Sequence, residues 1–312
     1  MPQLTNTFST YGAIGNREDL IDIITRISPT DTPFYSSVPK GKATNTLHEW
    51  QTQDLAAVVT NAQIEGDEAT NIAITPTVRL NNRTQISTKT VVVSGTQQSG
   101  MDPAGRKDEM AYQITLKGLE LKRDVESALC QNTTAVVGNN TTARVCRGLE
   151  GWVATNSSVG ATGVNPNYIT NTAPTDGTAR AFTETLLRAG LLGAYNEGGN
   201  PDTLMLGPAQ KQTFSSFTGG NTRFDISEDK AVTNSVDVYI SDFGRIKAVP
   251  NRFQRNRTAF GLEMQRWKFC NMRPMFTKDL AETGDFTRKQ IIWEWTLESL
   301  AEKSGFAVRD LT

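Results

Sequence analysis

One stretch, residues 102–132, constrains this chain most, because it predicts a single unusually long helix. Asp102 followed by Pro103 is typical of an N-cap and a first-turn proline. Apolar residues then recur three and four positions apart, at Met110, Ile114, Gly118, Leu121, Val125, Ala128 and Leu129. This spacing gives one apolar stripe on an otherwise highly charged helix. About 30 residues would span about 45 Å, so another element must cover the stripe. The pattern fits either a long helix that supports a structural protein or a surface helix of a large enzyme.

The composition excludes several classes of function. The chain has 312 residues, enough for two modest domains, and its net charge of −1 gives no bulk attraction to nucleic acid or anionic lipid. No apolar run is long enough to span a bilayer, and residues 1–6 lack the basic and apolar regions of a secretion signal. We therefore expect a protein that is made in a cytoplasm and has no membrane partner.

The residues that usually carry chemistry are sparse. The three cysteines, Cys130, Cys146 and Cys270, form no C-x-x-C pair, so we expect buried thiols and neither a disulfide framework nor a structural zinc site. His48 is the only histidine, and a structural hydrogen bond is its expected role. Asp242-Phe243-Gly244 matches a kinase tripeptide without the accompanying kinase motifs, so a hairpin turn is the better interpretation. We predict no catalytic, cofactor-binding or metal-binding residues.

The first 45 residues have little core of their own. Residues 1–15 are polar, and residues 16–27 predict a short amphipathic helix with Leu20 and Ile24 on its apolar side. Pro29 and Pro33 then favour turns over helix. A segment of this kind is expected to pack on a neighbouring molecule.

Residues 47–94 predict a long two-stranded excursion. Val78, Leu80, Val91 and Val93 alternate partly with polar residues, as in exposed strands, and the acidic stretch 63–69 forms its tip. A lone hairpin is marginal in water, so we expect it to lie against another subunit. The alternative is a hairpin folded back on its own domain.

The second half of the chain predicts a mixture of loops, a compact unit and strands. Residues 131–180 are loop-like, with Trp152 as their expected anchor. Residues 181–257 alternate helix and strand signals and are expected to form a self-sufficient domain. Strands follow at 258–269 and at 291–297, where Trp293 and Trp295 alternate with Glu294 and Thr296. The apolar face of this last strand is the expected partner of the long helix.

Several motifs together resemble a known family. They are Asn16–Leu20, the Ser-Pro-Thr-Asp-Thr-Pro-Phe segment at 28–34, His48–Thr52, Phe243–Lys247 and Glu294–Glu298. In this order they are similar to the major capsid proteins of tailed bacteriophages. The resemblance implies the α+β Hong Kong 97-like fold. Its parts would be an N-terminal arm (1–45), an extended loop (46–95), a peripheral domain (96–180 and 258–312, with a spine helix at 102–132) and an axial domain (181–257).

The resemblance also implies a function, partners and contact residues. The chain would build the icosahedral head shell around double-stranded DNA, as pentamers and hexamers with portal, decoration or scaffolding partners. Arm and loop contacts between subunits are expected at Leu20, Ile24, Phe34, Trp50, Ile64, Glu65, Asp67 and Arg79. The peripheral core is expected at Ile114, Leu121, Val125, Trp293 and Trp295. Two alternatives remain open: a bacterial nanocompartment shell and a cytoplasmic hydrolase.

Some shells of this kind are welded by a lysine of the extended loop and an asparagine of a neighbour. Here Lys89 is the only lysine between Trp50 and Ser94, and it lies at the base of the loop. We therefore expect a shell held by overlap of arms and loops or by a cementing protein, without covalent cross-links.

Overall fold

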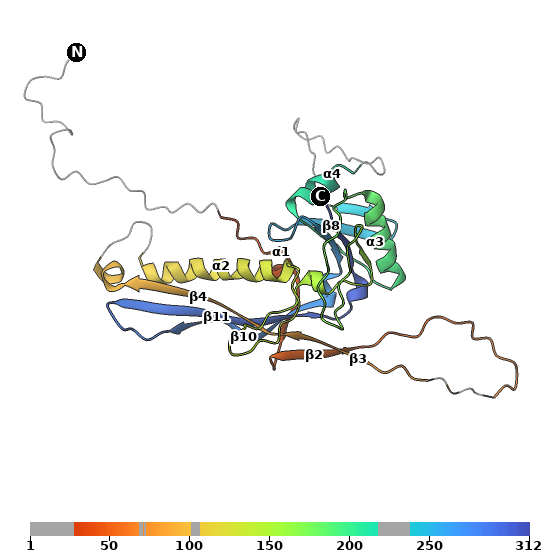
Figure 1. Ribbon diagram of the computed structural model, residues 1–312, viewed down its shortest axis with the longest axis horizontal. Helices are drawn as coiled ribbons and strands as arrows, with labels where there is room; N and C mark the ends of the chain where they lie inside the picture. The colour runs from red at the N-terminus through yellow and green to blue at the C-terminus, as the bar shows by residue number, and fades with distance from the viewer. Residues whose placement is uncertain (1–27, 69–70, 72, 101–106, 218–237) are drawn as a thin grey trace, which may run out of the picture.

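The computed structural model describes residues 28–68, 71, 73–100, 107–217 and 238–312. A long helix, α2, lies along a sheet that contains β4, β10 and β11 (Figure 1). A second sheet, with the shorter helices α3 and α4, stands beyond one end of α2, and a hairpin of β2 and β3 extends away from both. The predicted helix at 16–27 lies outside the described residues.

Helix α2 (Glu109–Cys130) is shorter than the sequence pattern predicts. It begins after Asp108, whose Oδ1 accepts a hydrogen bond of 3.1 Å from the backbone N–H of Ala111. Asp108 also accepts a hydrogen bond from Gln98, which belongs to a π-helical turn at Thr96–Gly100. The predicted start at Asp102 lies outside the described residues, and α2 itself begins at Glu109 because Asp108 caps it. The helix has 22 residues, which corresponds to about 33 Å.

The sheet under α2 has four strands. Antiparallel β10 and β11 form its centre, and β1 pairs with β10 in parallel. In spatial order the strands are β1 (Lys40–Lys42), β10 (Trp267–Asp279), β11 (Phe286–Ser299) and β4 (Gln85–Ser94). The prediction of one excursion over 47–94 is wrong for its last part. Val91 and Val93 are buried under α2, because β4 pairs with β11 and not within the hairpin.

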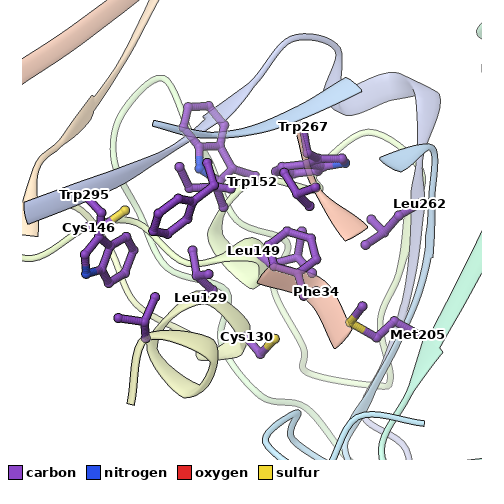
Figure 2. Packing of buried hydrophobic residues seen from close by; sticks show 14 of the residues in the cluster. Phe34, Leu129, Cys130, Cys146, Leu149, Trp152, Met205, Leu262, Trp267 and Trp295 are labelled. Carbon is purple, nitrogen blue, oxygen red and sulfur yellow. The ribbon is translucent and has the colours of Figure 1, made fainter. Parts of the chain in front are cut away.

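The core lies where the α2 stripe meets this sheet. Leu121, Val125 and Leu129 are fully buried with Trp293 and Trp295 of β11, and Ile114 is partly buried against them. Figure 2 shows the same cluster around Leu129, with Trp152, Trp267 and Phe34 near it. The prediction that the strand at 291–297 covers the long helix is confirmed, although β4 also lies along α2, from Met110 to Asp124.

The other face of β11 is buried as well. Glu294 and Glu298 alternate with the tryptophans, which predicts that they face solvent, yet both are nearly inaccessible. The hairpin and the loop after α2 cover this face, and Arg144 and Arg273 pair with Glu294 at 2.5 and 2.7 Å. A strand with both faces covered can keep an alternating sequence only if its acidic side chains find partners.

The second sheet combines distant parts of the chain. Its strands in spatial order are β5 (Ser157–Ser158), β12 (Phe306–Arg309), β9 (Thr258–Leu262), β6 (Thr203–Leu206), β8 (Gly244–Pro250) and β7 (Val238–Ser241). The expectation of a self-sufficient unit at 181–257 is therefore wrong. Phe306 and Val308 of β12 and Ala259 of β9 complete its core. The predicted single strand at 258–269 is likewise divided between two sheets by a 3-10 turn at Met264–Arg266.

Several local predictions in this region are confirmed. Helix α3 (Glu184–Asn196) ends just before Gly198, α4 (Pro208–Ser215) begins at its proline, and Asp242-Phe243 forms the turn between β7 and β8. The C-terminal residue lies beside α4, where Gln210 donates a hydrogen bond of 2.6 Å to the carbonyl of Thr312 (Figure 1). Residues 131–180 contain isolated bridges, a 3-10 turn at Leu149–Gly151 and the two-residue strand β5, and Trp152 is fully buried among them.

We expect Trp293→Ala to destabilise the folded subunit by about 3–5 kcal/mol, because it removes a buried aromatic ring from the core. The substitution also leaves Asn271 without the indole N–H that donates to its Oδ1 at 2.7 Å. Urea unfolding of the soluble subunit measures the loss. Val92→Ala is the control, because Val92 is 56% exposed on β4, and it should change stability by less than about 0.5 kcal/mol. Equal stability of the two variants would contradict the central role of Trp293.

Candidate functional site

The hairpin consists of β2 (Leu47–Thr52), the loop 53–77 and β3 (Val78–Arg83), and its base is fixed to the body. The Trp50 indole donates a hydrogen bond of 2.7 Å to the carbonyl of Ser299, and its ring lies 5.4 Å from that of Trp152. His48 Nε2 lies 3.2 Å from Glu298 Oε2, so the predicted structural hydrogen bond of the histidine is confirmed. The base therefore belongs to the core of its own subunit.

The loop of the hairpin has the opposite character. Its apolar side chains are between 75% and 102% exposed, at Leu55, Val58, Val59, Ile64 and Ile74. Figure 1 shows the loop extending far beyond the body of the subunit. A fold-back of the whole hairpin onto its own domain, the alternative for this segment, is therefore excluded. Among the described residues of the loop, only Asp54 forms an ion pair, with Lys303 next to β2.

The loop ends in an acidic turn. The Asp67 N–H donates to the carbonyl of Ile64 at 3.1 Å, and Gly66 adopts a φ of +84°, which favours glycine. Glu65, Asp67 and Glu68 are exposed at this turn. An extended segment with apolar side chains behind an acidic tip is suited to lie on another surface.

The Ser-Pro-Thr-Asp-Thr-Pro-Phe segment is attached to α2 through a buried carboxylate. The backbone N–H groups of Phe34 and Tyr35 donate to Oε1 and Oε2 of Glu126, each at 2.8 Å, and Asn251 donates to Oε1 at 2.7 Å. Pro33 is expected to favour a turn, but it opens a one-turn helix, α1 (Pro33–Ser37), because proline suits the first helical position. Glu126 satisfies the free N–H groups of that helix.

Burial raises the pKa of Glu126, although the hydrogen bonds from Tyr35, Phe34 and Asn251 and the charge of Lys40 act in the opposite direction. Burial also lowers the pKa of Lys40 to about 8, against the opposing influence of Glu126. The Lys40 ammonium lies 3.5 Å from the centre of the Tyr35 ring and donates to the Tyr35 carbonyl. Helix α1 is thus held by the buried carboxylate of Glu126, and the exposed Lys40 adds its contacts to Tyr35.

Sequence reasoning missed Glu126, because a charged residue on a long helix is normally solvated. A signal was present, since Cys130 lies one turn further on the same side of α2 and is buried too. The apolar stripe widens at this end of the helix, and Glu126 falls within the wider part.

The structure separates the residues expected to contact neighbouring subunits. Phe34 was expected at an interface but is fully buried in its own core, 6.3 Å from the Trp267 ring, because α1 packs under α2. Trp50 also packs on its own subunit, as described above. Ile64, Glu65 and Asp67 are exposed on the loop, and Arg79 pairs with Glu49 across the hairpin at 3.4 Å. Leu20 and Ile24 lie outside the described residues.

A second apolar surface lies between α3 and the β7–β8 turn. A hollow of about 390 Å³ is lined there by residues including Leu192, Tyr239 and Ile240. Leu192 and Ile240 are exposed, and Arg188 and Asp242 stand at the same hollow. Tyr239 donates a hydrogen bond to Glu184 and so holds the strand against the helix.

The other groups that sequence analysis considered for chemistry have structural partners. All three cysteines are free and buried, as predicted. Lys89 lies on β4, where its Nζ is 2.7 Å from Asp124 of α2. In the described part of the chain, no helix has the length and apolar character that crossing a membrane requires.

Comparison with solved structures identifies the class of the fold. The capsid asymmetric unit of Cyanophage A-1(L) matches with a TM-score of 0.67 and 12% identity, over 99% of this chain and 100% of that one. A structure of Phage G major capsid and decoration proteins matches with a TM-score of 0.56 and 10% identity, over 100% of both chains. The long helix on its sheet, the hairpin and the second sheet are therefore those of a Hong Kong 97-like shell protein, as expected.

The sequence places the chain within that class. The family model described as SU10 major capsid protein matches residues 3–312. The major capsid protein of Escherichia phage Phieco32 is 28% identical over 324 residues, which cover 92% of each chain. The chain belongs to the SU10 major capsid protein family, so it is a major capsid protein of a tailed phage and part of the virion. The prediction of a phage major capsid protein is confirmed.

We expect Glu126→Gln to destabilise the subunit by about 1–3 kcal/mol. Both oxygens of the carboxylate accept hydrogen bonds, whereas only one of the two terminal atoms of an amide can accept. Its NH₂ group would face a backbone or side-chain N–H that the carboxylate now satisfies. Chemical denaturation measures the difference. Glu120→Gln is the matched control on the same helix, since Glu120 is partly exposed and pairs with Lys117 at 2.8 Å. An equally small effect of both substitutions would contradict the role assigned to Glu126.

Proposed function

We propose that the hairpin loop lies across a neighbouring copy of this chain and that this overlap holds the shell together. The observation that carries the proposal is the exposure of Leu55, Val58, Val59, Ile64 and Ile74 on a loop whose base is firmly fixed. Each such side chain gains about 1.5–3 kcal/mol when it is fully buried. Contiguous exposed apolar side chains commonly mark a protein contact. Because a shell consists of many copies of this chain, a second copy is the partner available to each loop.

Rings of identical subunits follow from contacts of this kind. A loop that binds a different surface on the next copy makes a heterologous contact, and such contacts close into rings. We propose pentamers and hexamers. The hollow between α3 and the β7–β8 turn supports a second contact between copies, because Leu192 and Ile240 are exposed beside it.

The domains are proposed with boundaries that follow the sheets. The arm covers residues 1–45, and the extended loop covers 46–84, because β4 belongs to the sheet under α2. The peripheral domain comprises β4, α2, β10 and β11. The axial domain comprises α3, α4 and the second sheet, including β9 and β12 from the C-terminal part.

The shell is proposed to act without enzymatic chemistry of its own and to enclose double-stranded DNA. A net charge of −1 suits a wall that touches packaged DNA only non-specifically. A portal and decoration or scaffolding proteins are proposed partners. The Phage G structure is described as containing decoration proteins, which supports one such partner here.

Overlap without covalent welding is proposed as the source of strength. Lys89 is held between Asp124 and Glu120 of α2, at 2.7 and 4.0 Å. The Lys89 side chain is 31% exposed beside the long helix, and strand β4 lies far from the loop tip (Figure 1). A lysine engaged in this way is not free to reach an asparagine of another subunit.

We expect the double variant Val58→Asp and Ile64→Asp to leave the subunit folded and to impair the assembly of stable shells. Both side chains are exposed in the single subunit, so the midpoint of its thermal unfolding should stay unchanged. Negative-stain microscopy and sedimentation measure the yield of closed particles. Asn61→Asp with Gln63→Asp is the matched control, since it adds the same charge to the same loop at polar positions. Wild-type particle yield and heat resistance in the first variant would contradict the proposed overlap.

A further inference from the structure

Three side chains of types that bind metals meet at the base of the hairpin. They are His48 of β2, Cys270 of β10 and Glu298 of β11, and their ligand atoms all lie within 4.8 Å of one another. Glu298 Oε2 is 3.2 Å from His48 Nε2 and 3.2 Å from Cys270 Sγ. We propose that these three side chains form a zinc site, which goes beyond the shell function and does not depend on contacts between subunits.

Two of the three separations between ligand atoms suit a tetrahedral ion. Zinc binds cysteine sulfur at about 2.3 Å and histidine nitrogen or carboxylate oxygen at about 2.0–2.2 Å, so its ligand atoms stand about 3.3–3.6 Å apart. The two separations from Glu298 Oε2 are close to this range. A thiolate, an imidazole and a carboxylate form a ligand set that zinc accepts, and the softer thiolate disfavours calcium and magnesium.

Neighbouring groups pack closely on the three ligands and orient them. Gly41 of β1 lies beside Cys270, and a Cβ at Gly41 would stand 2.7 Å from the sulfur. The His48 ring lies 5.6 Å from the Trp50 ring, which limits its rotation, and Lys268 lies 3.9 Å from the other oxygen of Glu298. Partners around the first ligands normally fix their geometry and raise metal affinity.

The site has one open side. The side chains of His48 and Glu298 keep 15% and 10% of their surface exposed, whereas Cys270 is buried. A water molecule can therefore complete the tetrahedron from the solvent side. On binding, the thiol proton of Cys270 is released to water and a zinc–sulfur bond forms. The thiolate and the carboxylate then balance the two positive charges of the ion.

The physical effect would be a tie between the hairpin and the sheet. His48 belongs to the strand that leads into the loop 53–77, whereas Cys270 and Glu298 belong to the central strands of the sheet. A bound ion adds its binding free energy to the stability of the arrangement that presents all three ligands. Zinc would thus stiffen the base of the hairpin and leave the loop free.

The test uses the full-length subunit, first stripped of metal with a chelator and then dialysed against zinc. Elemental analysis should give about one zinc ion per subunit. Cys270→Ser and His48→Gln should each lower the zinc content to background. Cys130→Ser is the matched control, because Cys130 is another buried thiol that donates no ligand to this cluster. This variant should bind as much zinc as the unmodified chain.

Two further measurements keep the proposal falsifiable if Cys270→Ser folds poorly. Cobalt added in place of zinc should give a thiolate-to-metal absorption band that His48→Gln weakens. Zinc should also slow hydrogen exchange of the β2 amides in the unmodified chain and not in His48→Gln. Zinc content equal in the unmodified chain and His48→Gln, or a cobalt spectrum without a thiolate band, would overturn the proposal.

Discussion

The packing of α2 against the tryptophan face of β11 is the interaction on which the rest of the structure depends. Neither element is stable alone. An isolated helix has marginal stability in water without tertiary packing, and a two-stranded ribbon leaves an apolar face exposed. Together they bury Leu121, Val125 and Leu129 with Trp293 and Trp295. The same strands lead to every other part: β3 precedes β4, β9 precedes β10, and β12 follows β11. The hairpin and the second sheet are thus extensions of one rigid plate, which consists of α2 and the four-stranded sheet.

Buried carboxylates attach distant segments to that plate. Glu126 accepts from the backbone of Phe34 and Tyr35, and Glu150 lies 2.8 Å from Arg255 and accepts from Thr258. Burial raises the pKa of both Glu126 and Glu150. Such groups add little net stability, but each leaves an unsatisfied charge if its partners move away. They therefore favour one arrangement of segments that apolar contacts alone would leave less defined.

The sequence predicts well what depends on neighbouring residues and poorly what depends on long-range pairing. The end of α2, the strand at 291–297 and the turn at Asp242-Phe243 have local periodicity or turn chemistry, and the structure has them there. The N-cap at Asp108 was not predicted, because Asp102-Pro103 upstream matches the usual N-cap pattern more closely. The membership of β4, β9 and β12 in their sheets was not predictable, because alternation is the same in either sheet. The approach of His48 to Cys270 and Glu298 was not predictable either, because it depends on the same long-range pairing of strands.

The contrast between a fixed base and a free loop explains how one subunit can be both rigid and adaptable. The base of the hairpin is held by Trp50 and His48 within its own subunit, so the direction of the loop is set before assembly. In the proposed overlap, contact with a neighbour would order only the loop, which would keep the entropic cost of each contact low. Several such contacts would form at once in a proposed ring, and each would raise the effective concentration for the next. Under this proposal, weak apolar contacts at Val58 and Ile64 would be sufficient, and their weakness would let misplaced subunits dissociate before the shell closes.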